Sequence, residues 1–317
     1  MSEHQPRRAV VTGGAGFIGS HLVDRLVDNN VDVLVIDDLS TGHFDFLADA
    51  RQRGDVDMHR IDIQSPGLHT VIERFRPDTV FHLAAQASVT VSVEDPLRDA
   101  GVNILGTLNL LEISRHVGVK QFVFTSSGGA LHGSGAKLPS TERHVFRPES
   151  PYGVSKMVAR GYLDLFRSQY GLDYTALAPS NVYGPRQNAS AEGGVVAIFA
   201  RALLRGEQPT IFGDGEQTRD FVFVEDVVEA MVAGARHGGG KFLHISTGQE
   251  TSINALHEIM AGIVGTDIAP RYAPAKPGDI RRSWLTSEAA RRHLGWQAWT
   301  PLDEGLAATI KWVRESS

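Results

Sequence analysis

The chain of 317 residues contains no cysteine, which excludes disulfide bonds, cysteine nucleophiles and thiolate metal sites. It also has no long apolar run and no signal-peptide pattern, so the sequence predicts a cytoplasmic protein with no membrane partner. Its 13 histidines form no HExxH pair and no carboxylate cluster with ligand spacing. We therefore expect no metal site.

Blocks of like charge are also missing. The chain has 31 Lys and Arg against 37 Asp and Glu, for a net charge of -6. This balance argues against a nucleic-acid partner and favours small-molecule ligands. With 42% hydrophobic residues, a chain of this length can bury a large core, and we expect one large and one smaller lobe.

The first half of the chain alternates short buried strands with amphipathic helices. We expect strands at residues 8–12, 31–36, 80–83, 122–125 and 174–178, and helices at 20–29, at 103–116 and around Tyr152. This alternation predicts a doubly wound α/β fold, in which a parallel sheet is covered on both faces.

After residue 179, glycine and proline interrupt the pattern. Helices are expected at 195–204 and 224–236 and a strand at 241–246, which predicts a smaller α+β lobe interleaved with the sheet. The expected cofactor domain comprises residues 1–179 plus about 218–246. The expected substrate lobe comprises about 180–217 plus 247–317.

A glycine-rich loop at residues 13–19 follows the first strand and precedes a helix. In such a loop, backbone N–H groups and the helix N-terminus can meet a pyrophosphate without obstruction by side chains. The residues of this segment expected to contact a dinucleotide are Gly13, Gly16, Phe17, Ile18 and Gly19.

Acidic residues end the second strand and select the type of dinucleotide. Asp37 has the spacing at which a carboxylate hydrogen-bonds the adenosine ribose. It would repel a 2'-phosphate, and neither Gly14 nor Asp38 is the basic residue needed to accept one, so NAD is favoured over NADP. Asp62 and Ile63 follow another expected strand and are placed beside the adenine.

Three residues further along carry the chemistry. Ser127 ends the apolar run Gln-Phe-Val-Phe-Thr-Ser-Ser at residues 121–127, and Tyr152 lies one helical turn before Lys156. The ammonium of Lys156 can lower the pKa of the phenol, and a phenolate is a usable general base. Ser127 can share the transferred proton. The sequence therefore predicts hydride transfer with a bound nicotinamide.

These features together resemble the extended short-chain dehydrogenase/reductase superfamily over nearly the whole chain. The resemblance rests on the glycine spacing, on residues 82–86 (His-Leu-Ala-Ala-Gln) and on the three catalytic candidates. Segments 181–187, 194–199, 218–221 and 277–282 look more narrowly like bacterial UDP-glucose 4-epimerases of the NAD-dependent epimerase/dehydratase family. Further NAD contacts implied by the resemblance are Leu83, Ala84, Ala85, Gln86, Asn103, Tyr152, Lys156 and Pro179.

The resemblance implies a reaction on a UDP-hexose. Tyr152 takes the proton of the sugar 4-hydroxyl while C4 gives hydride to NAD, and the 4-keto sugar turns over and receives the hydride on its other face. The sugar is expected beside Ser127, Gly128 and Tyr152. The uridine diphosphate is expected among Asn181, Val195, Thr210, Phe212, Arg219 and Asp279.

Homodimers are common in this superfamily, and two helices of this chain are candidates for the interface. They are the helix at 103–116 and the helix that carries Tyr152. The apolar residues expected there are Leu108, Leu111, Leu163 and Phe166, with the alternative that they face their own sheet.

Three positions depart from the pattern of these epimerases. Lys276 replaces a frequent arginine, His132 replaces a tyrosine near the expected sugar-side wall, and Ser283 is small enough to admit an N-acetyl group at C2. Ser127 is followed by Gly-Gly-Ala, which disfavours dehydratases and decarboxylases because these carry an acidic residue there.

Three alternatives stay open at this point. One is a UDP-glucuronate 4-epimerase, in which Arg186 would pair with the sugar carboxylate. The second is a nucleotide-sugar 4-ketoreductase, which would use the same three residues with an exchangeable cofactor. The third is a catalytically silent NAD-sensing binding module.

Overall fold

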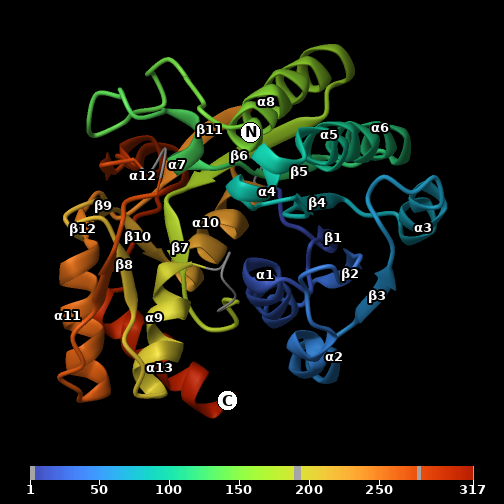
Figure 1. Ribbon diagram of the computed structural model, residues 1–317. Helices are drawn as coiled ribbons and strands as arrows, with labels where there is room; N and C mark the ends of the chain where they lie inside the picture. The colour runs from blue at the N-terminus through green and yellow to red at the C-terminus, as the bar shows by residue number, and fades with distance from the viewer. Residues whose placement is uncertain (1–3, 189–193, 277–279, 317) are drawn as a thin grey trace.

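A seven-stranded parallel sheet forms the larger part of the molecule (Figure 1). The computed structural model describes residues 4–188, 194–276 and 280–316. The strand order is β11-β6-β5-β4-β1-β2-β3. The chain adds β2 and β3 on one side of β1 and then adds the strands from β4 onward on its other side. The strands are β1 (Arg8–Thr12), β2 (Asp32–Asp37), β3 (Val56–Arg60), β4 (Thr79–His82), β5 (Gln121–Thr125), β6 (Asp173–Pro179) and β11 (Lys241–Ile245). This confirms the predicted doubly wound fold.

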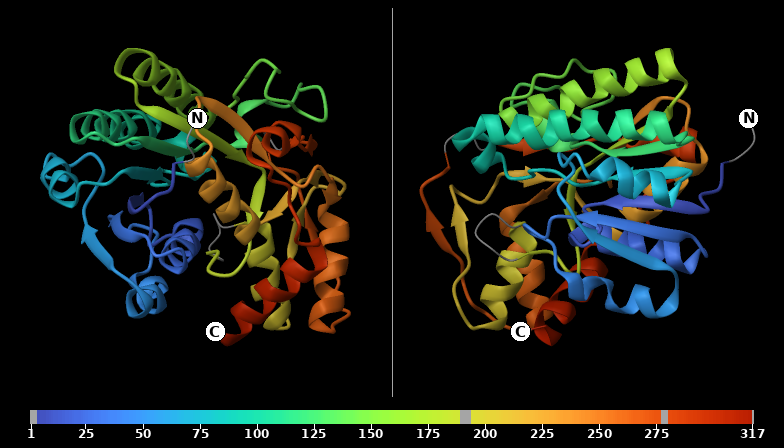
Figure 2. Two further views of the ribbon diagram at one scale, coloured as in Figure 1. Left: turned by 180° about the vertical axis from the view of Figure 1, so that it is seen from behind. Right: turned by 90° about the vertical axis from the view of Figure 1, so that its right-hand side faces the viewer.

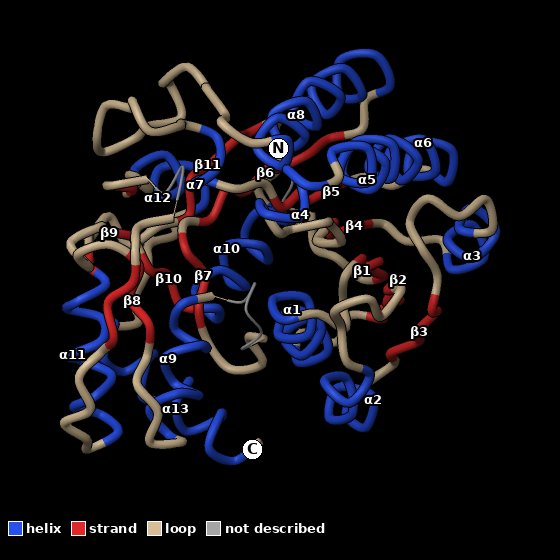
Figure 3. The backbone as a smooth tube through the Cα atoms, viewed as in Figure 1, coloured by secondary structure: helices blue, strands red, loops and turns tan. Residues whose placement is uncertain are grey.

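Helices cover both faces of the sheet, as Figure 3 shows by colour. Two separate core clusters lie on its two sides, one under α1 and α10 and the other under α3, α6 and α8. The inner strands β1 and β4 are largely apolar and almost wholly buried, because helices cover both of their faces. The helices of this part are α1 (Phe17–Asp28), α2 (Ala48–Arg53), α3 (Leu68–Phe75), α6 (Thr107–Val117), α8 (Pro151–Tyr170) and α10 (Val224–Arg236).

A smaller lobe of short strands and helices lies beside the sheet (Figures 1 and 2). Its three small sheets pair β10 with β7, β9 with β12 and β14, and β13 with β8. One core cluster joins its helices and strands. Its elements are β7 (Asn181–Tyr183), α9 (Val195–Leu204), β8 (Thr210–Phe212), β9 (Thr218–Arg219), β10 (Phe221–Phe223), β12 (Thr251–Ser252), α11 (Ile253–Val264), β13 (Arg271–Ala273), β14 (Arg282–Ser283) and α13 (Leu302–Glu315). Helix α12 (Glu288–Leu294) precedes α13 in the sequence but packs on β11 and α10 of the large sheet.

Several short helices were not expected from the sequence. Helices α4 (Val89–Glu94) and α5 (Pro96–Ala100) precede a π-helix, η2 (Gly101–Gly106), which continues directly into α6. A 3-10 helix, η1 (Phe44–Leu47), precedes α2, and α7 (Gly128–Leu131) follows β5. Among the described residues, no helix combines the length and the apolar character that a membrane crossing requires.

The residues expected at a dimer interface are mostly buried within their own protomer. Leu111, Leu163 and Phe166 belong to the core cluster under α6 and α8, and Leu108 packs against it. The alternative, that these residues face their own sheet, is therefore the correct one. The helices themselves carry other apolar side chains on their outer surface.

Candidate active site

The glycine loop between β1 and α1 has no room for side chains. Gly13 has a φ of +70°, and a Cβ there would lie 2.8 Å from the amide nitrogen of Ala84. A Cβ on Gly19 would lie only 2.1 Å from the carbonyl oxygen of Gly13. Gly16 caps α1 without a side-chain hydrogen bond, and Phe17 and Ile18 form the first turn. The bare helix N-terminus and the open backbone fit the pyrophosphate of a dinucleotide.

Asp37 ends β2 beside this loop and is almost fully buried. Its carboxylate accepts hydrogen bonds from the backbone N–H groups of Ala15, at 3.0 Å, and Leu39, at 2.9 Å. Burial raises the pKa of Asp37, and these two hydrogen bonds oppose the rise. Asp38 is exposed and accepts a hydrogen bond from the backbone N–H of Ser40. One buried and one exposed carboxylate at this strand end fit NAD, because neither would accept a 2'-phosphate.

Asp62 and Ile63 follow β3 and lie near the same edge of the sheet. Asp62 is exposed and accepts a hydrogen bond from the backbone N–H of Gln64, whereas Ile63 is buried. A Cβ on Gly106 would lie 2.6 Å from Ile63, so Ile63 packs closely on the π-helix. A contact between these two residues and the adenine stays a prediction.

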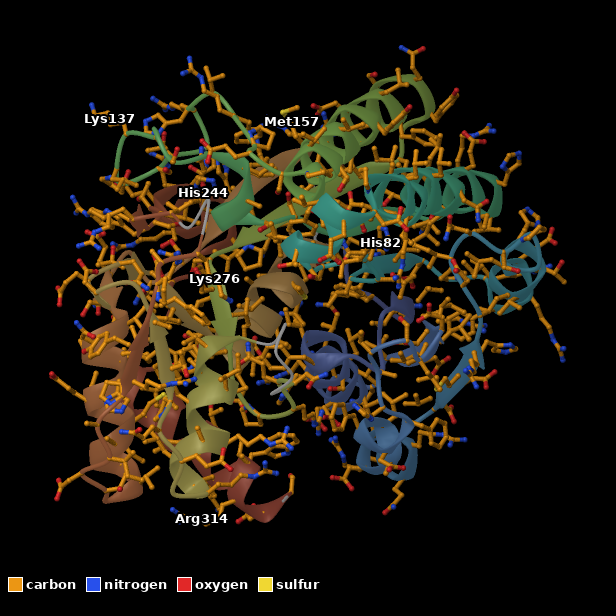
Figure 4. The ribbon with its side chains drawn as sticks, viewed as in Figure 1. His82, Lys137, Met157, His244, Lys276 and Arg314 are labelled. Carbon is orange, nitrogen blue, oxygen red and sulfur yellow. The ribbon has the colours of Figure 1, made fainter. Side chains whose placement is uncertain are left out.

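A buried histidine fixes the start of the loop after β4. The ring of His82 hydrogen-bonds the hydroxyls of Thr12, at 2.7 Å, and Thr107, at 2.9 Å (Figure 4). The backbone N–H groups of Leu83 and Ala84 donate to Thr12. Burial lowers the pKa of His82 to about 3, so the ring is neutral. His82 thus joins β1, β4 and α6, a role that the sequence motif did not indicate.

The same loop is held at its other end by Asn103. Its side-chain oxygen accepts from the backbone N–H of Gln86, and its amide donates to the backbone carbonyl of Gln86, both at 2.9 Å. The amide of Asn103 also donates to Asp99 at 2.9 Å. Asn103 therefore fixes the backbone of the Leu83–Ala84–Ala85–Gln86 segment, while a direct contact with NAD stays a prediction.

Ser127, Tyr152 and Lys156 come together at the carboxyl end of β5. Ser127 caps α7, and Tyr152 lies in the first turn of α8, one turn before Lys156. The side chain of Ser127 hydrogen-bonds the hydroxyl of Tyr152. The ammonium of Lys156 donates to the carbonyl of Thr125 at 3.0 Å and lies 5.8 Å from the centroid of the Tyr152 ring. The arrangement fits proton transfer at the Tyr152 hydroxyl.

The pKa of Tyr152 differs from the prediction. Burial raises the pKa of Tyr152 to about 12, although the hydrogen bond from Ser127 lowers it. The expectation of a lowered phenol pKa is therefore wrong for the protein groups acting alone, because desolvation is the largest effect and the charge of Asp99 adds to it. Burial lowers the pKa of Lys156 to about 8, and the charge of Asp99 opposes this.

The wall around the three residues is closely packed but contains unused polar atoms. The buried hydroxyl oxygens of Thr125 and Ser126 have no hydrogen-bond partner within the part of the chain that the structure describes. A Cβ on Gly128 would lie 2.9 Å from the carbonyl oxygen of Ala178, next to Pro179 at the end of β6. Only glycine fits beside Ser127, and the free hydroxyls suit a polar cofactor or sugar.

The residues expected around the uridine diphosphate lie on elements of the smaller lobe. Asn181 begins β7, Val195 begins α9, Thr210 and Phe212 lie on β8, and Arg219 lies on β9. Residues of β7, α9 and β8 share the core cluster of that lobe. Asp279 falls outside the described residues. Their contacts with a nucleotide stay predictions.

Two cations near this region already have partners. Arg219 donates to the carbonyls of Thr218 and Ile280, each at 2.7 Å. The ammonium of Lys276 lies 4.3 Å from the centroid of the Phe212 ring, and Figure 4 labels Lys276 above β8. Lys276 is therefore held over the aromatic ring by a cation–π contact.

The structure gives internal partners to Arg186, which one alternative assigned to a sugar carboxylate, and to His132, one of the departures from the epimerase pattern. Arg186 forms an ion pair with Asp24 of α1 at 2.7 Å, which weakens the alternative in which it binds a sugar carboxylate. His132 is buried against His244 and Phe146, and the Nε2 atoms of the two histidines lie 3.1 Å apart. Internal packing, not a sugar contact, therefore accounts for His132, contrary to the expected place in the sugar-side wall.

Comparison with known proteins supports this reading of the site. The model of the NAD dependent epimerase/dehydratase family matches residues 9–246. The chain belongs to this family. A UDP-glucose 4-epimerase of Mycolicibacterium smegmatis is 46% identical over 311 residues, which cover 98% of this chain and 99% of the relative.

Two solved structures of such enzymes are similar over almost their full length. The UDP-glucose 4-epimerase of Thermotoga maritima with UDP-glucose is 44% identical, with a TM-score of 0.94 and coverage of 98% of this chain and 99% of that one. The UDP-N-acetylglucosamine 4-epimerase of Methanobrevibacter ruminantium, in complex with UDP-N-acetylmuramic acid, is 35% identical. Its TM-score is 0.94, and the match covers 99% of this chain and all of that one.

Proposed function

We propose that this protein is an NAD-dependent UDP-glucose 4-epimerase, an isomerase that interconverts UDP-glucose and UDP-galactose. The observation that carries the proposal is the group of Ser127, Tyr152 and buried Lys156 beside a glycine loop shaped for NAD. The full-length identity with UDP-glucose 4-epimerases supports the same reaction. The acidic residue of dehydratases and decarboxylases is replaced by Gly128.

Each residue of the group has a chemical task. Tyr152 holds and releases the proton of the sugar 4-hydroxyl, and Ser127 shares that proton through its hydrogen bond to the phenol. Lys156 places a positive charge next to the ring. NAD held by the glycine loop and Asp37 would supply a group that takes up the hydride of C4 and gives it back, and its positive ring charge would favour the phenolate. That added charge opposes the desolvation that raises the pKa of Tyr152.

The smaller lobe supplies the proposed nucleotide site. We assign Asn181, Val195, Thr210, Phe212 and Arg219 to the uridine diphosphate, together with Asp279 outside the described residues. Phe212 offers a partly exposed ring for stacking. Lys276 over that ring would meet a phosphate as a point charge and not as a bidentate donor.

The proposed division of the chain follows from the same roles. The NAD-binding domain comprises residues 1–179 plus about 218–246, and the nucleotide-sugar lobe comprises about 180–217 plus 247–317. Helix α10 packs on α1, and β11 pairs with β6, which supports the second segment of the NAD-binding domain. The chain crosses between the lobes within that segment, since β9 and β10 pair with strands of the smaller lobe.

A second substrate is included in the proposal because of Ser283. This small residue lies on β14 directly beside Arg219 of β9. It leaves more space than a large side chain would for an N-acetyl group at C2 of the sugar. The similarity to a UDP-N-acetylglucosamine 4-epimerase supports this extension.

NMR of the purified protein with separate UDP-sugars tests the function. UDP-glucose, UDP-N-acetylglucosamine and UDP-glucuronate are each incubated without added cofactor. We expect the C4 epimer of UDP-glucose, which would show epimerisation and retained NAD together. No epimer from any of the three, even with NAD supplied, would refute the proposal, and consumption of added NADH would indicate a ketoreductase.

Replacing Tyr152 by phenylalanine tests the mechanism. The change removes only the hydroxyl, so NAD and UDP-glucose should still bind, while turnover should fall by about 10²- to 10⁴-fold. Bound NAD is measured by absorbance after acid release, and binding of UDP-glucose by calorimetry. Turnover at the wild-type rate would contradict the assigned role.

We also propose that the protein forms a homodimer through the outer surface of α4, α5, η2 and α8, which pack against one another. Six large aliphatic side chains are exposed there, and Leu97 is 84% exposed. They are Val89, Val93, Leu97, Leu105, Val154 and Leu165. Exposed apolar residues gathered on adjacent helices favour a second copy of the same surface.

Light scattering on two variants tests this dimer. Leu97→Glu should convert a dimer of the wild type into a monomer, because it places a charge in the apolar surface. Tyr272→Glu is the matched control, since Tyr272 is an exposed aromatic residue of the smaller lobe. A monomeric wild type, or an unchanged mass for Leu97→Glu, would refute the proposal.

A further inference from the structure

Asp99 is a buried carboxylate for which the motifs assigned no role. It lies on the short helix α5, which packs against α8, and is only 1% exposed. One of its oxygens accepts hydrogen bonds from the side-chain amides of Gln86, at 3.0 Å, and Asn103, at 2.9 Å. Among the described residues it has no cation within ion-pair distance. A charge in such a place needs a compensating group.

Lys156 is also buried, and it carries the opposite charge. Its side chain is 4% exposed, and its ammonium donates to the neutral carbonyl of Thr125. No carboxylate of the described chain lies within 4.0 Å of it. The carboxylate whose charge acts on Lys156 is Asp99, which also acts on Tyr152. Asp99 on α5 and Lys156 on α8 therefore face each other as buried opposite charges on two helices that pack together.

The other titratable groups around Lys156 do not supply a negative charge. His82 of β4 is buried and neutral. On α8 itself, Tyr152 lies one turn before Lys156. Three charged residues lie on or between the neighbouring short helices: Glu94 on α4, Asp95 at the junction and Arg98 on α5. All three are exposed to water, which screens their charges. Helices η2 and α7 and strand β5 contribute no charged side chain. The remaining neighbours are α6 and β6. Their titratable residues are not buried, with the exception of Tyr174, whose side chain is a phenol.

We propose that Asp99 is a positioning residue of the epimerisation site, with two actions. It holds the amides of Gln86 and Asn103, and so the loop 83–86, and it supplies the negative charge that balances the ammonium of Lys156. This inference rests on the proposed function, because it concerns the proton transfer that Tyr152 and Lys156 perform. Asp99 itself touches neither reacting atom.

The second action has a signature in the pH profile. The charge of Asp99 favours the ammonium of Lys156 and disfavours the phenolate of Tyr152. The active form needs the ammonium and the phenolate together. Removing the negative charge should lower the pKa values of both groups, so both limbs of the profile should move to lower pH. A purely structural role would lower the rate equally at every pH.

Asp99→Asn tests this signature because it keeps an oxygen for the two amides and removes the charge. We expect both limbs of kcat/KM for UDP-glucose to shift down by on the order of one pH unit. Glu94→Gln is the control, since it removes the same charge from an exposed position nearby. Asp99→Glu should keep the wild-type limbs with a lower rate. Unchanged limbs in an active Asp99→Asn variant would overturn the inference.

A thermal cycle tests the charge balance without any activity. Lys156→Met leaves Asp99 uncompensated and should lower Tm, and adding Asp99→Asn should restore much of that loss. A double variant that melts no higher than Lys156→Met would overturn the inference, and this comparison does not require Asp99→Asn alone to fold. A wild type without epimerase activity would refute the proposed function, whereas this cycle would still decide the pairing of Asp99 with Lys156.

Discussion

Replacing Gly19 by alanine is the sharpest test of the cofactor loop. The added methyl would lie 2.1 Å from the carbonyl oxygen of Gly13 and 2.8 Å from the Cα of Gly14. Both are backbone atoms, so no flexible side chain can move aside. The loop must shift by more than an ångström to reach ordinary contact distance. Overpacking of this kind costs about 1–3 kcal/mol.

That strain should appear in cofactor affinity. The loop of the variant relaxes away from α1, and NAD must return it to the closed position in order to bind. A cost of 1–3 kcal/mol corresponds to an affinity for NAD that is lower by about 5- to 140-fold. Calorimetry on protein stripped of NAD measures this change.

The matched control is Gly262→Ala. Gly262 is an exposed residue in the last turn of α11, and a Cβ there meets nothing within 4 Å. Alanine should stabilise this helix by about 0.5–1 kcal/mol and leave NAD affinity unchanged. Wild-type affinity in Gly19→Ala would show that the close approach of α1 to the loop is not needed for binding, and the reasoning would fail.

Three further predictions concern selectivity and stability. Asp37→Asn should weaken the binding of NAD and reduce the preference of the protein for NAD over NADP, measured as the ratio of the two dissociation constants. An unchanged ratio would show that Asp37 does not contact the cofactor. Asp226→Ala should lower the free energy of unfolding by about 2–4 kcal/mol with kcat unchanged, because two partly buried backbone N–H groups and the hydroxyl of Thr300 lose their acceptor; denaturant melts check this. His82, His132 and His244 have folded pKa values of about 3, 4 and 4, below about 6.5 in the unfolded chain, so the unfolded state binds more protons between pH 6.5 and 4. The free energy of unfolding should therefore fall by about 1–2 kcal/mol per histidine from pH 7 to pH 5, and equal urea midpoints would contradict this.

The large sheet could be predicted because its signals are local. Each inner strand is a short apolar run, and the loop at 13–19 marks the turn into the first helix. The three catalytic candidates could also be found, since Ser127 ends such a run and Tyr152 and Lys156 share one helical turn. Their meeting in space follows from the parallel order of the strands.

The elements that were missed depend on tertiary contacts. Helix α4 contains three valines and a threonine, which favour strands, and it is helical because it packs on α5 and α8. Asp99 adjoins an arginine in the sequence and looks like a surface acid, and only the fold reveals its burial. The pKa of Tyr152 was misjudged for the same reason, because desolvation cannot be derived from a four-residue spacing.

The place of β11 in the sheet has a consequence for biosynthesis. This strand covers the edge of β6, yet it is translated only after β7, α9 and β8 of the other lobe. A nascent chain that ends before residue 241 leaves β6 with an open edge, which can pair with another chain. Truncation to an isolated NAD-binding module should therefore yield an aggregation-prone fragment, and the two lobes must be completed together.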